Sequence, residues 1–432
     1  MNTHAPLTER RFLVPFVLIT TLFFLWAFGV NLNDILIPRF RTAFALNDFQ
    51  SSFIQVAFFG GYCFAAFPAG KLMERIGYKR GILIGLCLCA SGALLFVPAS
   101  SVRVYGFFLL ALFVMACGQS FLEVASNPYA TILGPAQSSE RRLNFAQSFN
   151  AVGAVAAMVL GRVFILTGVE YTPAQLATMT GAQVHAYRAE QASTVKIPYA
   201  LIAGIFVFVA CLIIFAHIPD VIEKVSDSET EEDPSWRRVL SQSHLVKGVI
   251  AQFFYVGAQV GVGSFVIRFA QHTMRNLTSQ DAWYYLLGHW IGFMVGRFTG
   301  SAIMKRVSPS RLLFLFAGAS FTCAIVAVAA NGLVPVWAVV LIGFFHSIMF
   351  PTIFALGIKN LGPLTKRGSS LMVMAIVGGA VIPAVMGKVS DLTNIQTAFF
   401  IPLICYGYIL YFALVGYRPS PLALTEVAVG EG

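Results

Sequence analysis

Charged residues are scarce in this chain of 432 residues. Only 11% of the residues are Asp, Glu, Lys or Arg, whereas an ordinary soluble domain carries about 25%. Hydrophobic residues make up 57% of the sequence. A soluble protein of this composition would expose large apolar surfaces to water. The scarcity of charge therefore excludes a cytosolic enzyme and a disordered chain, and it indicates an all-α polytopic membrane protein.

Several motifs that would carry chemistry are missing as well. The seven cysteines all lie inside apolar runs without metal-ligand spacing, so we expect free thiols rather than disulfides or a metal site. Despite a formal net charge of +10, no Lys/Arg-rich run typical of nucleic-acid binding is present. The sequence also lacks GxxxxGK[ST], HExxH and GxSxG. It therefore predicts neither an enzyme nor an ATP-driven pump, with no cofactor and no nucleic-acid partner.

Long apolar runs dominate the chain instead. About 20 apolar residues cross a hydrocarbon core of roughly 30 Å, and only helices or closed barrels satisfy their backbone groups in lipid. The runs here are continuous rather than alternating, so they predict α-helices. Twelve spans are predicted, at 13–42, 51–74, 80–98, 104–133, 142–167, 197–219, 247–271, 281–303, 311–330, 334–359, 368–388 and 395–416.

Basic residues set the predicted orientation. Placing both termini in the cytoplasm puts 19 of the 29 Lys and Arg on the cytoplasmic side, eight on the outer side and two, Arg162 and Arg297, within spans. This asymmetry follows the positive-inside rule. The one long charged stretch, 220–246, is predicted to be a cytoplasmic linker between an N-terminal bundle over 1–219 and a C-terminal bundle over 247–432.

Three patterns recur in the same order in both halves. The pairs are RIGYKR at 75–80 with RVSPSR at 306–311, Leu-Gly-Pro at 133–135 with 361–363, and Gly153-Ala154 with Gly378-Gly379. Parallel six-helix repeats place a substrate site between the halves, near the membrane midplane. The predicted fold is therefore two pseudo-symmetric six-helix bundles.

The segment GKLMERIGYKR at 70–80 resembles the signature loop of the major facilitator superfamily, which has this architecture. Its charges would latch the two halves together on the cytoplasmic side. We therefore expect Gly70, Glu74, Arg75 and Gly77 to form a cytoplasmic gate. A positive-inside loop with a tight glycine turn is compatible with the same residues.

Of the 19 carboxylates, 17 lie in loops or at the ends of the spans, and two, Asp34 and Glu123, lie in the interior of predicted spans. An ionised side chain near the middle of a bilayer costs at least ~2.5–3.5 kcal/mol and usually marks a transport pathway or a proton relay. Apolar surroundings favour the neutral form of a carboxyl group, so each of the two is a candidate to bind and release a proton. The alternative is a structural ion pair with Arg162 or Arg297.

Amide side chains share helix faces with these carboxylates. The polar faces comprise Asn31 beside Asp34 with Trp26 nearby, Asn127 beside Glu123, Gln147 with Asn150, and Tyr255 with Gln259. Amides and carboxylates beside an aromatic ring suit a polyhydroxylated ligand. Interhelical hydrogen bonding is the alternative use of such residues, but several such faces together with two carboxylates favour a binding site.

Two further features of the predicted C-terminal bundle indicate packing. Four glycines recur at every fourth position of one span, at 288, 292, 296 and 300. They predict a face on which a neighbouring helix approaches closely. His289 and His346 are expected to be hydrogen-bonded packing residues rather than relays.

Longer motifs in both halves carry a second resemblance. They are FFLWA at 23–27, NLNDIL at 31–36, LE at 122–123, ASNP at 125–128, LNFAQSFN at 143–150, YVGAQ at 255–259, GRFTG at 296–300 and PTIFALGIKNLG at 351–362. Together they are similar to the motifs of the fucose–galactose–glucose:proton symporter family. The resemblance implies a major facilitator fold, a bacterial inner-membrane location and sugar uptake coupled to protons.

The same resemblance implies roles for single residues. Asp34 and Glu123 would couple proton to sugar. The sugar-binding set would comprise Trp26, Asn31, Asn127, Gln147, Asn150, Tyr255 and Gln259. The expected partners are a monosaccharide, a proton and the lipid bilayer, with a monomer as the functional unit.

L-Fucose is the first-choice substrate, and glucose or galactose is the alternative. The fucose symporters have Trp, Tyr and Asn where this chain has Gly263, Phe350 and Val30, which would reshape the sugar pocket. A major facilitator exporter and a passive facilitator are the rival functions, and sodium is the rival coupling ion.

Overall fold

The computed structural model describes residues 6–44, 48–164, 178–193, 196–216, 236–274, 277 and 279–418. Within these ranges it does not describe the side chains of 32–43, 48–52, 55, 161–164, 191–192 and 279–280. In the described part, all regular secondary structure is helical, which confirms the predicted all-α class.

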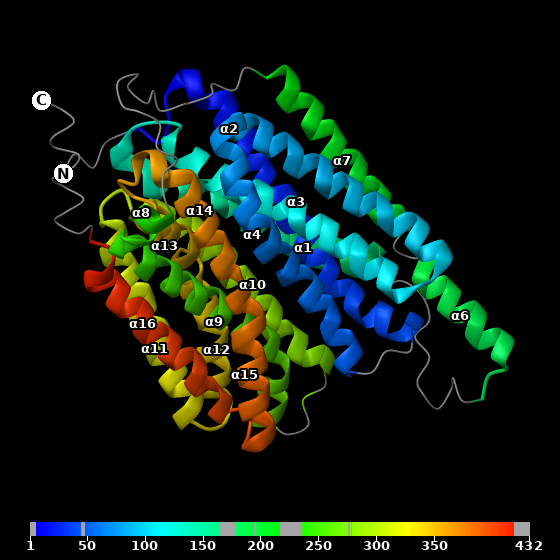
Figure 1. Ribbon diagram of the computed structural model, residues 1–432. Coiled ribbons are helices and arrows are strands. Elements are labelled where there is room, and N and C mark those ends of the chain that lie inside the picture. Colours follow the sequence, from blue (N-terminus) through cyan, green and yellow to red (C-terminus); the bar gives the residue numbers. More distant parts are fainter. Residues whose placement is uncertain are drawn as a thin grey trace, which may run out of the picture.

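Two groups of helices lie side by side (Figure 1). The first group contains α1 (Leu13–Phe44), α2 (Asp48–Val102), α3 (Tyr105–Ile132), α4 (Ser139–Phe164) and α7 (Lys196–Phe215), with the shorter α6 (Gly181–Ser193) at its edge. Within it, α1 packs on α4, and α2 packs on α3 and α7.

The second group contains α9 (Ser243–Thr273), α10 (Ser279–Ile303), α11 (Pro309–Ala329), α12 (Leu333–His346), α13 (Met349–Gly357), α14 (Thr365–Met374), α15 (Gly378–Leu392) and α16 (Phe400–Tyr411). The short helix α8 (Trp236–Leu240) precedes it and falls inside the stretch 220–246 predicted as a linker. Residues 220–235 of that stretch lie outside the described part. The predicted division into bundles over 1–219 and 247–432 stays a prediction.

Ten stretches of helix in the described residues are long and apolar enough to cross a membrane. One of them lies in α2, which runs through two of the predicted spans. The chain bends between these two spans at Gly77. Gly77 has φ 78° and ψ 172°, a conformation that glycine adopts without steric cost. Counting both arms of α2 and adding the 25-residue helix α10 gives the twelve predicted crossings.

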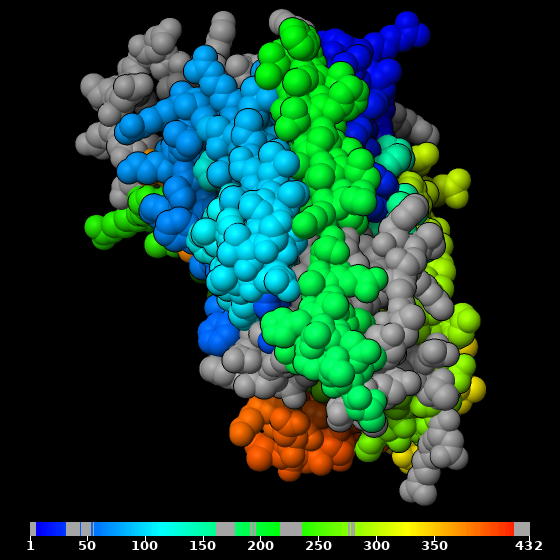
Figure 2. Space-filling model, turned by 90° about the vertical axis from the view of Figure 1, so that its right-hand side faces the viewer, coloured from blue at the N-terminus to red at the C-terminus, as the bar shows by residue number. Residues whose placement is uncertain are grey.

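The outer surface of α7 shows why these helices need lipid. Leu201, Phe208 and Phe215 are 63%, 62% and 88% exposed, while the opposite face of the helix buries Tyr199 and Phe206. A helix that is apolar on every side is stable when its outer face contacts lipid. Figure 2 shows α7 (green) lying along the blue and cyan helices on this face of the molecule.

The internal repeat appears in the packing. In the first group, Gly153 of α4 lies directly against the backbone carbonyl of Phe24 in α1. In the second group, Gly378 at the start of α15 lies in the same way against the carbonyl of Phe253 in α9. Two glycines that the sequence paired thus make equivalent contacts, which supports the repeat and leaves no room for a side chain at either position.

The glycines of α10 form the close-packing face that the sequence predicted. A Cβ at Gly296 would lie 2.5 Å from the carbonyl oxygen of Phe344 and 2.5 Å from Oγ of Ser347, and a Cβ at Gly300 would overlap Ile348. α10 therefore rests on the α12–α13 segment at backbone distance, which fixes the position of Arg297.

Both groups of helices have connections at one end of the molecule, which we call the charged end. It comprises the bend of α2 near Gly77, the α3–α4 connection at 133–138 and the α13–α14 connection at 358–364. α1 also begins at this end, since the Thr8 hydroxyl donates a hydrogen bond to the carbonyl of Leu133 over 2.6 Å.

Replacing Gly296 by Val should destabilise the fold by about 1–3 kcal/mol, because overpacking forces the two helices apart. The expected result is a lower melting temperature in detergent. Gly204→Val is the matched control, since a Cβ at Gly204 on α7 meets nothing within 4 Å. Equal melting temperatures for the two variants would contradict the packing described for α10.

Candidate functional site

A cavity of about 570 Å³ lies between the two groups of helices. In the described part of the chain, the first group lines it with Trp26, Ala27, Val30, Asn31, Ile54, Phe58, Phe59, Tyr62, Leu112, Glu123, Gln147, Asn150, Ala154 and Met158. The second group lines it with Val256, Gln259, Val260, Gly263, Ser264, Trp283, Leu286, Trp290, Phe293, Arg297, Phe350 and Ile376. Because Ile54 and Trp283 lie near the starts of α2 and α10, the cavity extends from the middle of the bundle towards the end opposite the charged end.

The polar groups of the first wall gather at the inner end of the cavity. Glu123 of α3 is 6% exposed, and its Oε2 atom has no hydrogen-bond partner among the described residues. Gln147 and Asn150 of α4 lie three residues apart and both line the cavity, as do Asn31 and Trp26 of α1. The predicted carboxylate–amide–indole constellation is thus assembled around one space.

Arg297 of α10 closes this inner end from the second group of helices. Its Nη1 donates hydrogen bonds to the backbone oxygen of Gln147 and to Oε1 of Gln147, the latter over 2.9 Å. The guanidinium also lies 4.6 Å from the ring centroid of Phe293. Arg297 is 3% exposed, so an arginine buried in the membrane joins the two halves at the floor of the cavity.

Glu123 and Arg297 influence each other without pairing. The two side chains interact electrostatically, but Glu123 makes no ion pair with any described residue. The sequence left open a structural pair with Arg162 or Arg297. Arg297 instead bonds to Gln147, and the side chain of Arg162 lies outside the described residues.

Two residues predicted to bind sugar do not line the cavity. Asn127 lies one helical turn beyond Glu123 towards the charged end, is fully buried, and accepts a hydrogen bond from Gln147 Nε2 over 2.8 Å. Tyr255 is also fully buried and donates to the carbonyl of His346 over 3.0 Å. Both share a helix face with a cavity residue but lie deeper in the protein, where they hold neighbouring groups in place.

Asp34 belongs to α1, but its side chain lies outside the described residues. Gln259 of α9 does line the cavity. Of the predicted set, the structure therefore brings together Trp26, Asn31, Glu123, Gln147, Asn150 and Gln259.

The charged end is closed by an ion pair between the halves. Nε and Nη2 of Arg367 in α14 donate to the two carboxylate oxygens of Glu74 in α2 over 2.7 and 3.0 Å. Arg367 is 2% exposed, and its guanidinium lies 5.3 Å from the ring centroid of Trp236 in α8. Trp236 in turn stacks on Phe67 of α2 at 4.8 Å. A bidentate arginine–carboxylate contact of this kind stabilises the closed end and also fixes the relative orientation of the two side chains.

The other predicted gate residues surround this pair. Gly70 allows Ser370 of α14 to approach, since a Cβ at Gly70 would lie 2.7 Å from the Ser370 Cβ. Gly77 makes the bend in α2. Arg75 is exposed at the charged end.

One face of α4 connects the charged end with the cavity. Glu140 Oε1 accepts a hydrogen bond from Lys359 Nζ over 2.6 Å. One turn further, Asn144 Nδ2 donates to Thr352 Oγ1 over 3.1 Å. Gln147 follows at the next position on this face. Three consecutive contacts of one helix thus bind the two halves from the charged end to the cavity floor.

The buried histidines of the second group make hydrogen bonds, as the sequence predicted. Nε2 of His346 lies 2.6 Å from the Tyr406 hydroxyl, and Nδ1 of His289 lies 3.1 Å from the carbonyl of Val339. Both are at most 1% exposed.

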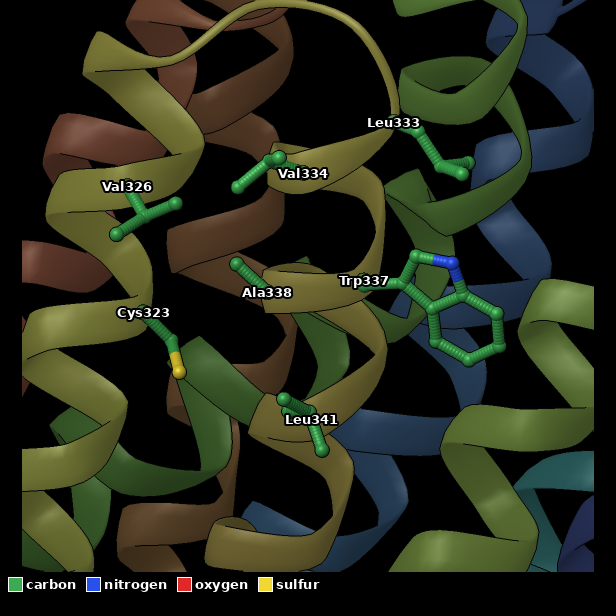
Figure 3. Close-up of a pocket in the computed structure, with 7 residues that line it drawn as sticks. All are labelled: Cys323, Val326, Leu333, Val334, Trp337, Ala338 and Leu341. Carbon is green, nitrogen blue, oxygen red and sulfur yellow. The ribbon is translucent and has the colours of Figure 1, made fainter.

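A second hollow lies on the outer side of the molecule, between α11 and α12. It is lined by Cys323, Val326, Leu333, Val334, Trp337, Ala338 and Leu341 (Figure 3). Its side chains are apolar apart from one thiol and one indole N–H. It lacks the carboxylate and amides of the central cavity, so the central cavity is the candidate site.

Comparison with known proteins agrees with this architecture. The chain matches the Major Facilitator Superfamily over residues 18–383. The chain belongs to the Major Facilitator Superfamily. It is thus a multi-pass membrane protein from a family of transporters rather than enzymes, as the sequence indicated.

Similar proteins within the superfamily carry sugar-transport names. The chain is 43% identical over 402 residues to the glucose/galactose transporter of Brucella abortus biovar 1 (strain 9-941), covering 93% of each chain. It is 42% identical over 410 residues to the L-fucose-proton symporter of Escherichia coli (strain K12), covering 94% of this chain and 93% of the other.

Two solved structures extend the comparison. The crystal structure of the superfamily transporter FucP in the outward conformation has a TM-score of 0.86 at 42% identity, covering 94% of this chain and 99% of that one. The proton:xylose symporter XylE, at 11% identity and a TM-score of 0.67, shares the fold.

Some residues of the site were not found from the sequence. Arg297 was noted inside a span, but its contact with Gln147 was not predicted, because the partner lies 150 positions away. Trp283, Trp290 and Phe293 were not singled out. Their spacing with Leu286 and Arg297, by three and four residues in turn, marks one helix face and is the signal that was available.

Replacing Glu74 by Gln should weaken the closure of the charged end, because the bidentate contact from Arg367 then loses its carboxylate acceptor at position 74. The closed state should lose about 1–3 kcal/mol. Spin labels at Lys71→Cys and Pro363→Cys, in a background lacking the exposed Cys87 and Cys211, should show longer distances. Glu190→Gln, an exposed carboxylate on α6, is the matched control. An unchanged distance distribution in Glu74→Gln would contradict the role given to the pair.

Proposed function

We propose that the chain imports a hexose or deoxyhexose through the bacterial inner membrane by symport with protons. The observation that carries this proposal is Glu123, a carboxyl group at the cavity floor whose Oε2 has no partner among the described residues. It stands beside amides and an indole that suit a sugar. The names of the glucose/galactose transporter and the L-fucose-proton symporter support both parts of the proposal.

Glu123 is the proposed proton carrier of the described site. A carboxyl group in a poorly hydrated place takes up and loses a proton according to its surroundings, and the positively charged Arg297 lines the same cavity. Movement of Arg297 relative to Glu123 would change the protonation of Glu123 during the cycle. Asp34 is proposed as the second carboxylate on the basis of its sequence motif.

The amides of the first wall are the proposed sugar ligands. Gln147, Asn150 and Asn31 offer both donors and acceptors to hydroxyl groups, and Trp26 offers a flat face to C–H groups. Gln259 adds an amide from the opposite wall. Asn127 and Tyr255 are proposed as positioning residues, because one holds Gln147 and the other holds the α12–α13 segment.

The arrangement suits an outward-open transporter. We propose that the charged end faces the cytoplasm, with both termini, and that the gate of Gly70, Glu74, Arg75 and Gly77 keeps it shut while the cavity opens outward. Two rigid halves, 1–219 and 247–432, would then rock about the central site, joined by the linker 220–246. A single chain supplies both walls, so we take the monomer as the transporting unit.

Purified protein in liposomes should accumulate D-glucose, D-galactose or L-fucose against a gradient when the external pH is lower than the internal pH. Accumulation should increase as the external pH falls, because protons enter with the sugar, and a protonophore should abolish it. Flux that equilibrates without accumulation would indicate a passive facilitator. Accumulation that requires sodium would replace the proton by that ion.

Glu123→Gln should lower gradient-driven accumulation at least about tenfold, because an amide cannot carry the proton. Counterflow of labelled sugar against unlabelled sugar should survive, since exchange needs no net proton movement. Glu190→Gln serves as the control for loss of a carboxylate elsewhere. Normal accumulation by Glu123→Gln would refute the coupling role of Glu123.

A further inference from the structure

Both walls of the cavity combine rings and aliphatic side chains with polar groups. The wall from the first group of helices carries the polar residues Glu123, Gln147, Asn150 and Asn31 among its rings. The wall from the second group carries the rings of one face of α10, together with Gln259, Ser264 and Arg297. A sugar held between them would place hydroxyl groups on the amides and C–H groups on the rings.

One face of α10 builds the aromatic part of the second wall. Trp290 packs edge-to-face on Phe293, with ring centroids 5.4 Å apart and an interplanar angle of 76°. The Arg297 guanidinium in turn lies over the Phe293 ring. Trp290 thus belongs to a packed series that ends at the cavity floor. It lies seven residues, roughly 10 Å along the helix, from Arg297 towards the open end of the cavity.

Gly263 of α9 stands opposite this ring. Among the described residues, a Cβ at Gly263 would lie within 4 Å of one atom, Cζ2 of Trp290, at 4.0 Å. Other glycines of α9 have a different reason to be small, because a Cβ would overlap Ile382 at Gly257 and Met386 at Gly261. No such close approach of helices requires glycine at 263, so its effect is to leave space in the cavity beside the indole.

We propose that Trp290 and Gly263 together allow the site to accept a hexose as well as a 6-deoxyhexose. The indole of Trp290 stacks on the C–H face of the pyranose, and the missing side chain at 263 accommodates the hydroxymethyl group that a hexose carries and a 6-deoxyhexose lacks. The inference rests on the proposed sugar transport and names the substrate class of that same site.

The placement of the sugar follows from its two contacts. Ring hydroxyls reach the amides and the carboxyl group at the floor, while one face of the ring lies on the indole. The hydroxymethyl group projects from the rim of the ring, and Gly263 and Ser264 line the cavity beside Trp290. A side chain at 263 would occupy that space and would leave a methyl group less affected than a hydroxymethyl group.

The test compares sugars that differ only in the 6-hydroxyl group. D-Galactose with 6-deoxy-D-galactose, and D-glucose with 6-deoxy-D-glucose, form matched pairs for uptake into proteoliposomes. Gly263→Val should raise the KM of the hexose about tenfold or more, the scale of a group excluded from a fitted pocket. The KM of the 6-deoxy sugar should change less than about threefold on the same grounds. Gly263→Ala should shift the ratio in the same direction by less.

Trp290→Ala should raise the KM of both sugars by about tenfold, since both lose the stacking surface. Gly204→Val on α7 and Trp337→Ala on the outer face of α12 are the matched controls and should leave the KM values unchanged. Size-exclusion profiles in detergent establish that each variant is folded. If Gly263→Val does not fold, the comparison is made with Gly263→Ala.

Two failures are distinguishable. Wild-type protein that transports hexoses, with variants that leave the hexose to 6-deoxyhexose ratio unchanged, would overturn the role of Trp290 and Gly263 and leave the proposed transport intact. Wild-type protein that transports neither member of either pair, nor L-fucose, would overturn both.

Discussion

The contact between Arg297 and Gln147 is the constraint on which the central region depends. A guanidinium that is 3% exposed in the middle of a membrane protein needs partners, and it obtains them from a backbone oxygen and an amide of the opposite half. The same contact forms the cavity floor and orients an amide that lines the cavity. Among the described residues Glu123 then has no ion-pair partner, since Arg297 bonds to Gln147 instead. The unpaired Oε2 of Glu123 and the closed floor therefore have one cause.

Small residues make this contact geometrically possible. Gly296, next to Arg297, brings α10 to backbone distance from the α12–α13 segment, and Gly153 does the same for α4 on α1. Each half is thereby closely packed up to the interface, which in the described residues is crossed by specific polar contacts such as Asn144 with Thr352 and Arg367 with Glu74. Such an interface suits two halves that move relative to each other, because separation breaks a small number of specific hydrogen bonds and leaves the packing within each half intact.

Much of the fold and part of the site could be predicted from the sequence, for physical reasons that also set the limit. Hydropathy predicts the spans because lipid requires apolar helices. A carboxylate inside such a span is rare, and Glu123 is a candidate site residue for that reason. Helical spacing placed Gln147 and Asn150 on one face. Spacing does not give depth, so Asn127 and Tyr255, on the correct faces, lie buried beside the cavity. Nor does it give partners across the interface, such as Arg367 for Glu74.

The polar face of α4 explains how the two ends of the molecule can communicate. Glu140, Asn144 and Gln147 contact the second half at successive turns, from the charged end to the cavity floor. Because they share one helix, a movement of α4 that separates the halves at Glu140 would also displace Gln147. A sugar hydroxyl that donates to Gln147 Oε1 would share this oxygen with Arg297. Sugar binding at the cavity floor and opening of the charged end would thus act on the same helix, which is the physical connection that the proposed transport cycle requires.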